Sequence, residues 1–437
     1  MVARCSSRNR ASQAGQVLIL GLALLVAGGL GLHLLFSAGQ ALAAKRRLVD
    51  TADAAAWSAA VWRARVLNYH AYANRALIAN EVAIAQATTL LAWSKYFETL
   101  TRNAARLAQA FPPAQALLVA SAEAALLARQ SAELAAEIDI AARGAEDLGY
   151  RALLARSQDI LQATTLGFGV SMVAAEVARA THPSQFAWVL PDVSGRWAAA
   201  SRRADDPGSR QRFAALVRDS LDPFTAGPRS KNIGVIVPCV PIPMIRKRGG
   251  TALSDDLLRW EALDTLSLHT SRPRLIGCRQ SEIVPLGWGA AAAGPAGQTR
   301  DADIPGAGDN PAARQWAMGE VTAIERYSGL SSPMELDEDS LGGERLPVFQ
   351  LAVMVRRAAQ SLPTSMQKDL AEGALLPPDR FPGSGAIWAL SAAELYFKRP
   401  VSASERVEYA SLYNPYWHVR LAAPSAAQRS LALGYVR

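Results

Sequence analysis

The sequence predicts an α+β protein in which an N-terminal transmembrane helix continues into a long helical hairpin or stalk, followed by a mixed domain with an antiparallel sheet. Three observations predict this arrangement. Residues 17–36 are apolar and uncharged, residues 46–111 contain no proline or glycine, and proline, glycine and tryptophan become frequent from about residue 186. A chain of 437 residues, half of them apolar, can bury a substantial core.

The charge pattern argues against a nucleic-acid partner. The formal net charge is +8, but the Lys and Arg residues are scattered along the chain and usually lie near acidic ones. Binding to a phosphate backbone needs a concentrated basic patch. We therefore expect no nucleic-acid partner.

Residues 17–36, VLILGLALLVAGGLGLHLLF, are long enough to cross a hydrocarbon core of about 30 Å at about 1.5 Å per residue. A cleavable signal peptide has a shorter apolar region, of about 7 to 15 residues. Because ALA at 41–43 resembles a cleavage site, removal of the segment is the alternative. The length favours a retained transmembrane helix, preceded by a cytoplasmic segment at 1–16.

Basic residues flank this helix on both sides, so charge counting leaves its orientation open. They are Arg4, Arg8 and Arg10 before it, and Lys45, Arg46 and Arg47 after it. The chain that follows has many tryptophans, few cysteines and no nucleotide-binding motif. We therefore expect a single pass with a short N-terminus inside and the bulk of the chain outside.

Beyond Lys45, apolar and small residues recur at spacings of four and three, which is typical of a helix with one packed face. The stripe comprises Leu48, Ala52, Ala55, Ala59, Trp62, Val66, Tyr69, Ala73, Ala76, Ala83, Ala87 and Leu90, interrupted by Asn80. So many alanines indicate a closely packed partner helix, because small side chains allow short interaxial distances. We expect this face to pack against other small-residue helices.

A second helix is predicted after Pro112 and Pro113, where a long alanine-rich segment resumes the helical pattern. It can extend past Gly167 and Gly169 and must stop at Pro183, since the residue before a proline resists helical geometry. Residues 37–183 are therefore expected to form an extracytoplasmic helical stalk or hairpin. If unbroken, residues 17–111 alone would span about 140 Å.

The richest group of polar side chains in this half lies at residues 67–86. His70, Asn74 and Glu81 fall near one helical face, and a metal site there is conceivable, but the spacing matches no zinc motif. We favour hydrogen bonds between helices, made by Asn74, Asn80 and Glu81. No metal or other cofactor is expected.

Residues 184–437 are predicted to form the mixed domain. Candidate strands are 257–269, 345–357 and 385–399, bounded by Gly, Pro and charge. Their pairing should be antiparallel, because no helical crossovers are evident between them. Residues 290–345 have low hydrophobicity and are expected to be a long loop insertion, in part without regular structure.

The segment IGVIVPCVPIPMI at 233–245 is too short and too rich in proline to span a membrane. It is expected to be an edge segment or hairpin arm that ends in a basic turn, RKRGG, and offers a surface for a partner. Its Cys239 and the later Cys278 either form one bridge, if this region is extracytoplasmic, or are two buried thiols. Cys5 precedes the apolar run and is not placed like a lipoprotein cysteine.

Known catalytic patterns do not occur in the sequence. It has no phosphate-binding Gly-x-x-x-x-Gly-Lys loop, no Gly-x-Ser-x-Gly elbow, no His-Glu-x-x-His helix and no Cys/His cluster. The five histidines are far apart, and no acidic residue stands out as a partner for any of them. We therefore expect no catalytic residue and no enzymatic activity.

Residues 15–60 resemble the N-terminal module of the TadG-like proteins of the bacterial Flp or Tad (tight adherence) pilus machinery. The matching positions are Gly15, Gln16, Lys45, Arg46, Arg47, Leu48, Asp53, Ala54, Ala55 and Ala56. NRALIANEVAIAQ at 74–86 and LYNPYWHVRLA at 412–422 also resemble segments of pilus-assembly relatives. The second of these includes Tyr413, Asn414, Pro415, Tyr416 and Trp417.

The resemblance implies a single-pass inner-membrane protein with a periplasmic domain that supports assembly or anchoring of a thin adhesive pilus. Its partners would be the membrane and other proteins of the pilus or secretion machinery, and homo-oligomer formation stays open. Some relatives carry a von Willebrand type A domain. PDVSGR at 191–196 lacks that domain's metal loop, because Arg196 occupies the third ligand position.

Two alternatives remain. A minor pilin or pseudopilin would be cleaved after Gly15, but the fifth residue of the mature chain would then be Leu20, where such proteins have glutamate, and the chain is large for a pilin. A membrane-tethered periplasmic enzyme or sensor would need a deep polar pocket in the mixed domain.

Overall fold

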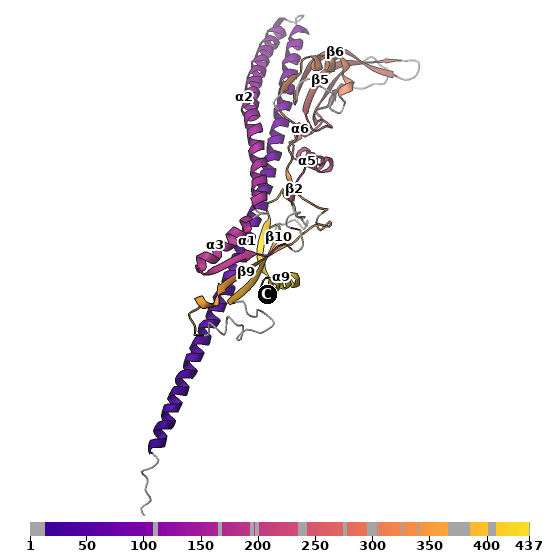
Figure 1. The fold of residues 1–437 in the computed structure, drawn as a ribbon. Helices are drawn as coiled ribbons and strands as arrows, with labels where there is room; N and C mark the ends of the chain where they lie inside the picture. Colours follow the sequence, from indigo (N-terminus) through magenta and orange to yellow (C-terminus); the bar gives the residue numbers. More distant parts are fainter. Residues whose placement is uncertain are drawn as a thin grey trace, which may run out of the picture.

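The computed structural model describes residues 14–107, 112–164, 168–192, 196, 201–234, 243–273, 278–294, 304, 306–324, 327–339, 341–365, 385–400 and 408–436. The fold is α+β, with a long N-terminal helix that carries the apolar run and with antiparallel sheets in the C-terminal part. The predicted fold class is confirmed at this level. The molecule is elongated, with the long helix running along its length (Figure 1).

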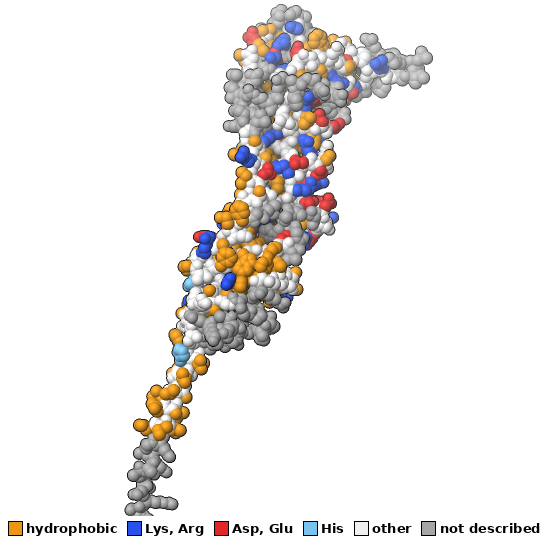
Figure 2. Space-filling view, viewed as in Figure 1, with side chains coloured by type: hydrophobic (Ala, Val, Ile, Leu, Met, Phe, Trp, Pro, Cys, Tyr) orange, Lys and Arg blue, Asp and Glu red, His pale blue; other side chains and the backbone are white. Residues whose placement is uncertain are grey.

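Helix α1, Ala14–Leu107, begins with a segment that touches little else in the chain. Large hydrophobic side chains in residues 17–36 are between 52% and 77% exposed. They form the narrow apolar end of the molecule in Figure 2. Among the described residues, this is the one helical stretch long and apolar enough to cross a membrane.

Helix α2, Pro112–Thr164, lies antiparallel to the later part of α1. Its contacts descend α1 in order, from Arg129 with Glu98 (2.5 Å) to Arg151 with Glu81 (2.8 Å). Helix α3, Val170–Thr181, then packs on α1 lower down through Ala174 and Ala178. It ends before Pro183, as predicted, whereas 165–167, where the helix was expected to pass Gly167, lie outside the described residues.

The predicted apolar stripe on α1 agrees with the structure between residues 48 and 59, beside the four-stranded sheet. Leu48, Ala52, Ala55 and Ala59 are fully buried. Farther along, Leu90 is 54% exposed, whereas Leu77, Ala85 and Ala92 are buried instead. A straight helix drifts by about 20° per heptad against a strict seven-residue repeat, so spacings of four and three gradually leave the packed face.

A four-stranded antiparallel sheet packs on the lower part of α1, in the order β1–β9–β10–β11. These strands are Gln185–Val189, Phe349–Ala358, Ala386–Phe397 and Trp417–Ala422. The predicted strands at 345–357 and 385–399 are therefore confirmed as β9 and β10. One face, with Val353, Val355 and Ile387, packs on α1 and α3, and helix α9, Ala426–Val436, lies on the other. Both faces are thus partly or wholly covered.

A five-stranded sheet packs on the upper part of α1, in the order β3–β4–β5–β6–β7. Its strands are Lys231–Ile233, Met244–Leu253, Trp260–Pro273, Cys278–Ala293 and Thr322–Ile324. The predicted strand at 257–269 is β5. Strand β6 touches α1 directly, because a Cβ on Gly289 would lie 2.2 Å from the Ala92 carbonyl oxygen. The β6–β7 pair is parallel, and β7 lies in a segment for which no strand was predicted.

The predicted basic turn RKRGG is wrong, because Gly249 and Gly250 lie within strand β4. The neighbouring strand β5 carries Asp264, which is fully buried and bound by Arg229 (2.8 Å) and Lys247 (2.5 Å). A Cβ on Gly249 would lie 2.2 Å from Asp264 Oδ1. The glycine therefore makes room for a buried carboxylate, and residues 235–242 before the strand lie outside the described residues.

The predicted loop insertion at 290–345 is also partly wrong. Residues 290–293 complete β6, and the segment further contains α7 (Pro311–Gly319), β7 and β8 (Met334–Leu336). Strand β8 pairs with β2, Ser201–Arg203, and helices α5 (Pro207–Asp219) and α6 (Pro223–Ala226) follow β2. Alanines such as Ala313 and Ala317 are buried, although they add little to average hydrophobicity. One sheet was predicted, and the structure has two larger ones.

Candidate functional site

The polar residues singled out at 67–86 lie in the middle of α1, where α2 and the segment 327–334 meet it. We use the name polar seam for His70, Asn74 and Glu81 of α1 together with Arg151 and Gln158 of α2. Helical geometry aligns them, because residues four, seven or eleven apart fall near one face. All are buried except Arg151, whose side chain is 11% exposed.

Both the nitrogen and the oxygen of the Asn74 side-chain amide form two hydrogen bonds within the protein. Its Nδ2 donates to the carbonyl oxygens of Met334 (2.6 Å) and Leu412 (2.7 Å). Its Oδ1 accepts from Gln158 Nε2 (3.1 Å) and from the Met334 amide (3.1 Å). One side chain therefore joins α1, α2, β8 and the segment before β11, and it can do so because an amide has two donors and two acceptor sites.

Glu81 is a fully buried carboxylate held by donors from three parts of the chain. Arg151 Nη2 donates to Oε1 (2.8 Å) and the Tyr327 hydroxyl donates to Oε2 (2.8 Å). Trp260 Nε1 lies 3.4 Å from the same Oε2. Burial, and next the charge of Glu81, raise the pKa of Tyr327 well above its ordinary value, so the phenol stays a donor.

Arg151 completes this arrangement. Its Nη1 donates to the Gly329 carbonyl oxygen (2.5 Å), and its guanidinium lies 5.1 Å from the centre of the Tyr327 ring. A buried ion pair stabilises a fold only when further hydrogen bonds satisfy its remaining donors and acceptors, as they do here. The arrangement joins α1 to α2 and to the 327–331 segment. Both Glu81 oxygens are occupied by donors within the chain.

His70 is fully buried one turn before Asn74. No described residue makes a hydrogen bond of normal geometry with either ring nitrogen, but the Gln162 side chain lies close enough to favour the protonated ring. Burial and the nearby Arg63 lower its pKa to about 4, so the ring is neutral near pH 7. The Asn74 and Glu81 oxygens that a metal ion would need accept hydrogen bonds from donors within the chain.

The residues of the N-terminal motif lie on different surfaces. Gly15 and Gln16 are in the first turn of α1, and their side chains lie outside the description. Lys45 Nζ donates to the Trp388 carbonyl oxygen, and burial lowers the pKa of Lys45. The side chains of Arg46 and Arg47 are exposed, and that of Asp53 is half-buried. Trp62 and Asn80, predicted as packing residues farther along α1, are also half-buried.

The C-terminal motif at 412–422 packs against α1. The Trp417 backbone exchanges two hydrogen bonds with the Asn68 side chain (3.1 Å each), and the Leu412 carbonyl oxygen accepts from Asn74. The rest of the motif packs locally: Tyr413 stacks on Phe213, Asn414 donates to Glu408, Tyr416 lies against Phe397, and Pro415 is half-buried. The fold thus brings 74–86 and 412–422 into contact.

Cys278, the first residue of β6, is disulfide-bonded. The predicted partner Cys239 lies outside the described residues, as does Cys5. Because Cys278 is oxidised, the expectation of two buried free thiols is wrong for this cysteine.

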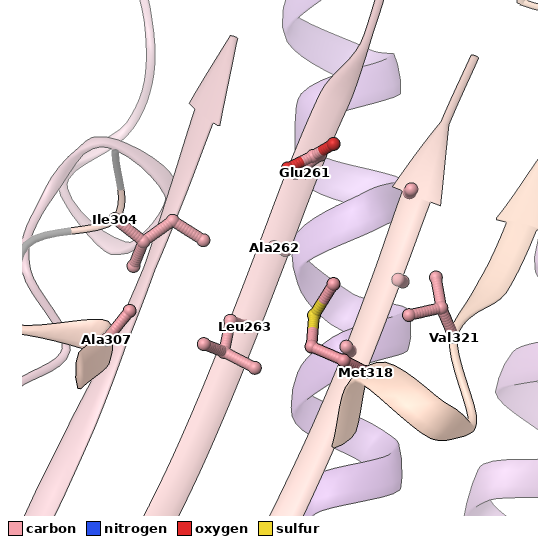
Figure 3. Close-up of a pocket in the computed structure, with 10 residues that line it drawn as sticks. Glu261, Ala262, Leu263, Ile304, Ala307, Met318 and Val321 are labelled. Atoms are coloured by element: carbon pink, nitrogen blue, oxygen red, sulfur yellow. The ribbon is translucent and has the colours of Figure 1, made fainter. Parts of the chain in front are cut away.

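A pocket in the upper half lies between β5, β6 and the segment around α7 (Figure 3). Apolar side chains including Leu263, Ile304, Met318 and Val321 line it, with Glu261 at one end. Its volume is about 20 Å³, which is room for about one water molecule. This pocket cannot hold a substrate.

Several residues that build these clusters were not predicted, among them Arg151, Gln158, Tyr327 and Asp264. A signal for two of them is present in the sequence. Arg151 and Gln158 are seven apart in an alanine-rich helix, so they share a face with small residues, and polar side chains there must find buried partners. Tyr327 and Asp264 carry no comparable pattern.

Comparison with models of known protein families, with curated proteins and with solved structures found no match to this chain.

Proposed function

We propose that this chain is a non-enzymatic, membrane-anchored component of a Flp/Tad-type pilus assembly system. In this proposal residues 17–36 cross the inner membrane and the rest of the chain lies in the periplasm. The protein acts by holding and positioning partners. The two halves of the proposal, the anchor and the pilus, rest on different observations.

The observation that carries the anchor is the change of environment along one helix. Helix α1 exposes every large apolar side chain in residues 17–36 and then buries one face from Ala44 onward. An apolar surface of this size is unfavourable in water and suits a hydrocarbon core. Because the helix has 94 residues, it extends about 140 Å at 1.5 Å per residue, which suits a stalk continuous with the anchor and stiffened by a hairpin with α2.

The disulfide at Cys278 supports the orientation. Disulfides persist in oxidising compartments such as the bacterial periplasm and are rare in the cytosol. The charges flanking the anchor left the orientation undecided. A bridge in β6 favours placing both sheets outside the cytoplasm.

The pilus assignment rests on the resemblance of residues 15–60 and 412–422 to pilus-assembly proteins. The contacts of these segments support treating them as one unit, since Lys45 binds β10 and Asn74 binds the 412 segment. One expectation changes. Ala52, Ala55 and Ala59 pack on the chain's own four-stranded sheet and α3, so they do not offer a free face to another pilus protein.

Deletion and complementation in a strain that makes such pili test the proposal. Loss of the gene should abolish surface pili, and the intact gene should restore them. Leu25→Arg, in the apolar segment, should move the protein out of the membrane fraction and abolish pili. Leu127→Arg, at an equally exposed site on α2, should do neither. Normal piliation without the gene would refute the pilus role, and crosslinking in intact cells followed by co-purification would identify the partner.

A minor pilin or pseudopilin is the second candidate. The observation that favours it is again the exposed apolar segment at the start of α1. Such a segment suits packing against copies of itself in a fibre as well as against lipid. Intact mass of the purified protein separates the two. A chain that starts at Gln16 identifies a processed pilin, and an unprocessed chain identifies the anchor.

A further inference from the structure

The segment that follows strand β9 is attached to α1 at a point before the first charged residue of that helix. Ser37 Oγ lies 2.8 Å from Ser365 Oγ, and Thr364 Oγ1 donates to the Ser37 carbonyl oxygen (3.0 Å). Ser365 Oγ also lies 3.2 Å from His33 Nε2. The segment after β9 therefore reaches the end of the apolar run.

The length of the uncharged part of α1 indicates where this attachment would lie relative to a bilayer. From residue 17 to residue 44 the chain has no charged side chain, and Lys45 is the first. At 1.5 Å per residue this stretch is about 42 Å long, and a bilayer with its headgroups is about 40–45 Å thick. If α1 spans the membrane, Lys45 marks the outer side of the headgroup layer.

A partly exposed aromatic patch lies at this level, on the sheet face that α9 covers only in part. Phe186, Arg356 and Trp388 are neighbours across β1, β9 and β10, and Lys45 binds the Trp388 carbonyl oxygen. Trp188 and Tyr435 complete what we call the aromatic patch. Phe186 (62%) and Tyr435 (50%) are its exposed members, whereas Trp188 is half-buried and Trp388 is buried (4%). Figure 2 shows hydrophobic side chains gathered over this part of the molecule.

One basic side chain lies on the aromatic patch, and two more lie on α1 at the opposite face of the same sheet. The Arg356 guanidinium is exposed and stacks on the Trp388 ring, 5.4 Å from its centre. Arg46 and Arg47 are exposed on α1 just beyond Lys45. Aromatic rings concentrate at membrane interfaces because they are amphipathic, and cations next to a membrane bind the phosphates of anionic lipids. The two kinds of side chain together match a headgroup layer.

We propose that the aromatic patch and Arg356 seat the four-stranded sheet in the headgroup layer of the leaflet from which α1 emerges, with anionic phospholipid as the ligand. This inference rests on the proposed membrane anchor. The seat is a second attachment beside α1, so it restricts tilting and rotation of the rest of the protein about the anchor.

Photocrosslinking of the full-length protein tests the seat. The photoreactive residue p-benzoylphenylalanine replaces Phe186 or Tyr435 in two variants. The protein is reconstituted in vesicles containing equal amounts of phosphatidylglycerol and phosphatidylethanolamine, and adducts are identified by intact mass. Phe224, an exposed aromatic residue on α6 beside the five-stranded sheet, is the matched control, and Leu25 in the apolar segment reports on the anchor.

The seat predicts lipid adducts at 186, 435 and 25, about tenfold above those at 224 and enriched in phosphatidylglycerol at 186. Arg356→Gln should lower that enrichment severalfold. Lipid adducts at 25 together with background levels at 186 and 435 would overturn the seat while leaving the anchor in place. Protein adducts in place of lipid adducts at 186 would overturn the seat and show that a second copy of this chain covers the patch. Background at all four sites would overturn the anchor and the seat together.

Discussion

Asn68 of α1 and Trp417 of β11 exchange two hydrogen bonds of 3.1 Å, one from Asn68 Nδ2 to the Trp417 carbonyl oxygen and one from the Trp417 amide to Asn68 Oδ1. Strand β11 is an edge strand, and the side-chain amide takes the place of a neighbouring strand's peptide group. A helix thus closes one edge of the four-stranded sheet, and this contact attaches the 412–422 motif to α1.

Asn68→Leu is expected to destabilise the protein by about 1–3 kcal/mol, because it leaves the Trp417 amide and carbonyl without partners while Trp417 stays buried. Chemical unfolding of the purified protein in detergent measures the loss. Tyr72→Leu, four residues along the same helix at a 62% exposed site, is the matched control and should change little. Equal stabilities for the two variants would contradict the role assigned to Asn68.

Removing one member of the Glu81–Arg151 pair should cost more than replacing both. Glu81→Leu leaves Arg151 and Tyr327 without their acceptor, and losing one partner of a buried pair costs about 3–5 kcal/mol. In the double variant Glu81→Leu with Arg151→Leu, the unpaired charge is absent. The unfolding free energies of the four proteins in this cycle give the coupling energy. Additive losses would show that the two side chains do not act as a pair.

Residues with regular spacing were predictable, and residues whose partners are distant in sequence were not. Leu48 to Ala59 repeat on a helical face, and β5, β9 and β10 are apolar runs between Gly, Pro and charge, so each has a local signal. The acceptors of Asn74 come from Met334 and Leu412, and Glu81 binds Tyr327. No spacing within one element predicts such contacts.

The predictions for RKRGG and for residues 290–345 were wrong for similar reasons. RKRGG resembles a turn because glycine pairs usually mark turns, but Gly249 is there to admit the Asp264 carboxylate from the next strand. In residues 290–345, alanines form much of the buried surface and carry little hydrophobic signal. In both segments the structure depends on residues that are distant in sequence, and a local sequence pattern carries no information about them.

Ala55→Trp is expected to damage the fold itself. Ala55 is fully buried against the four-stranded sheet and α3, so an indole has no room there, and overpacking of this kind costs at least about 1–3 kcal/mol. Ala54→Trp, at the adjacent exposed position, should stay within about 0.5 kcal/mol of the parent. Thermal unfolding and limited proteolysis would measure both. If Ala55→Trp folds as stably as Ala54→Trp but loses a binding partner, Ala55 faces another protein.

His70 should make stability depend on pH between about 6.5 and about 4. Burial and Arg63 lower its pKa from 6.5 to about 4, so in this window the unfolded chain binds a proton that the folded one excludes. The contribution is complete above pH 6.5 and is lost as pH falls to about 4, to a total of about 3 kcal/mol. Arg63 and Arg203 oppose protonation, whereas the Gln162 side chain and the charge of Asp159 favour it.

The measurement for His70 is the free energy of unfolding at several pH values for the parent and for His70→Phe. Carboxylates also titrate near the acidic end of this range, and the variant keeps them, so the difference between the two proteins isolates the histidine. The parent should lose more stability than His70→Phe as the pH falls from 6.5 to 4. Parallel curves would show that His70 accepts a proton in the folded state as easily as in the unfolded state, and the ring would then have access to solvent.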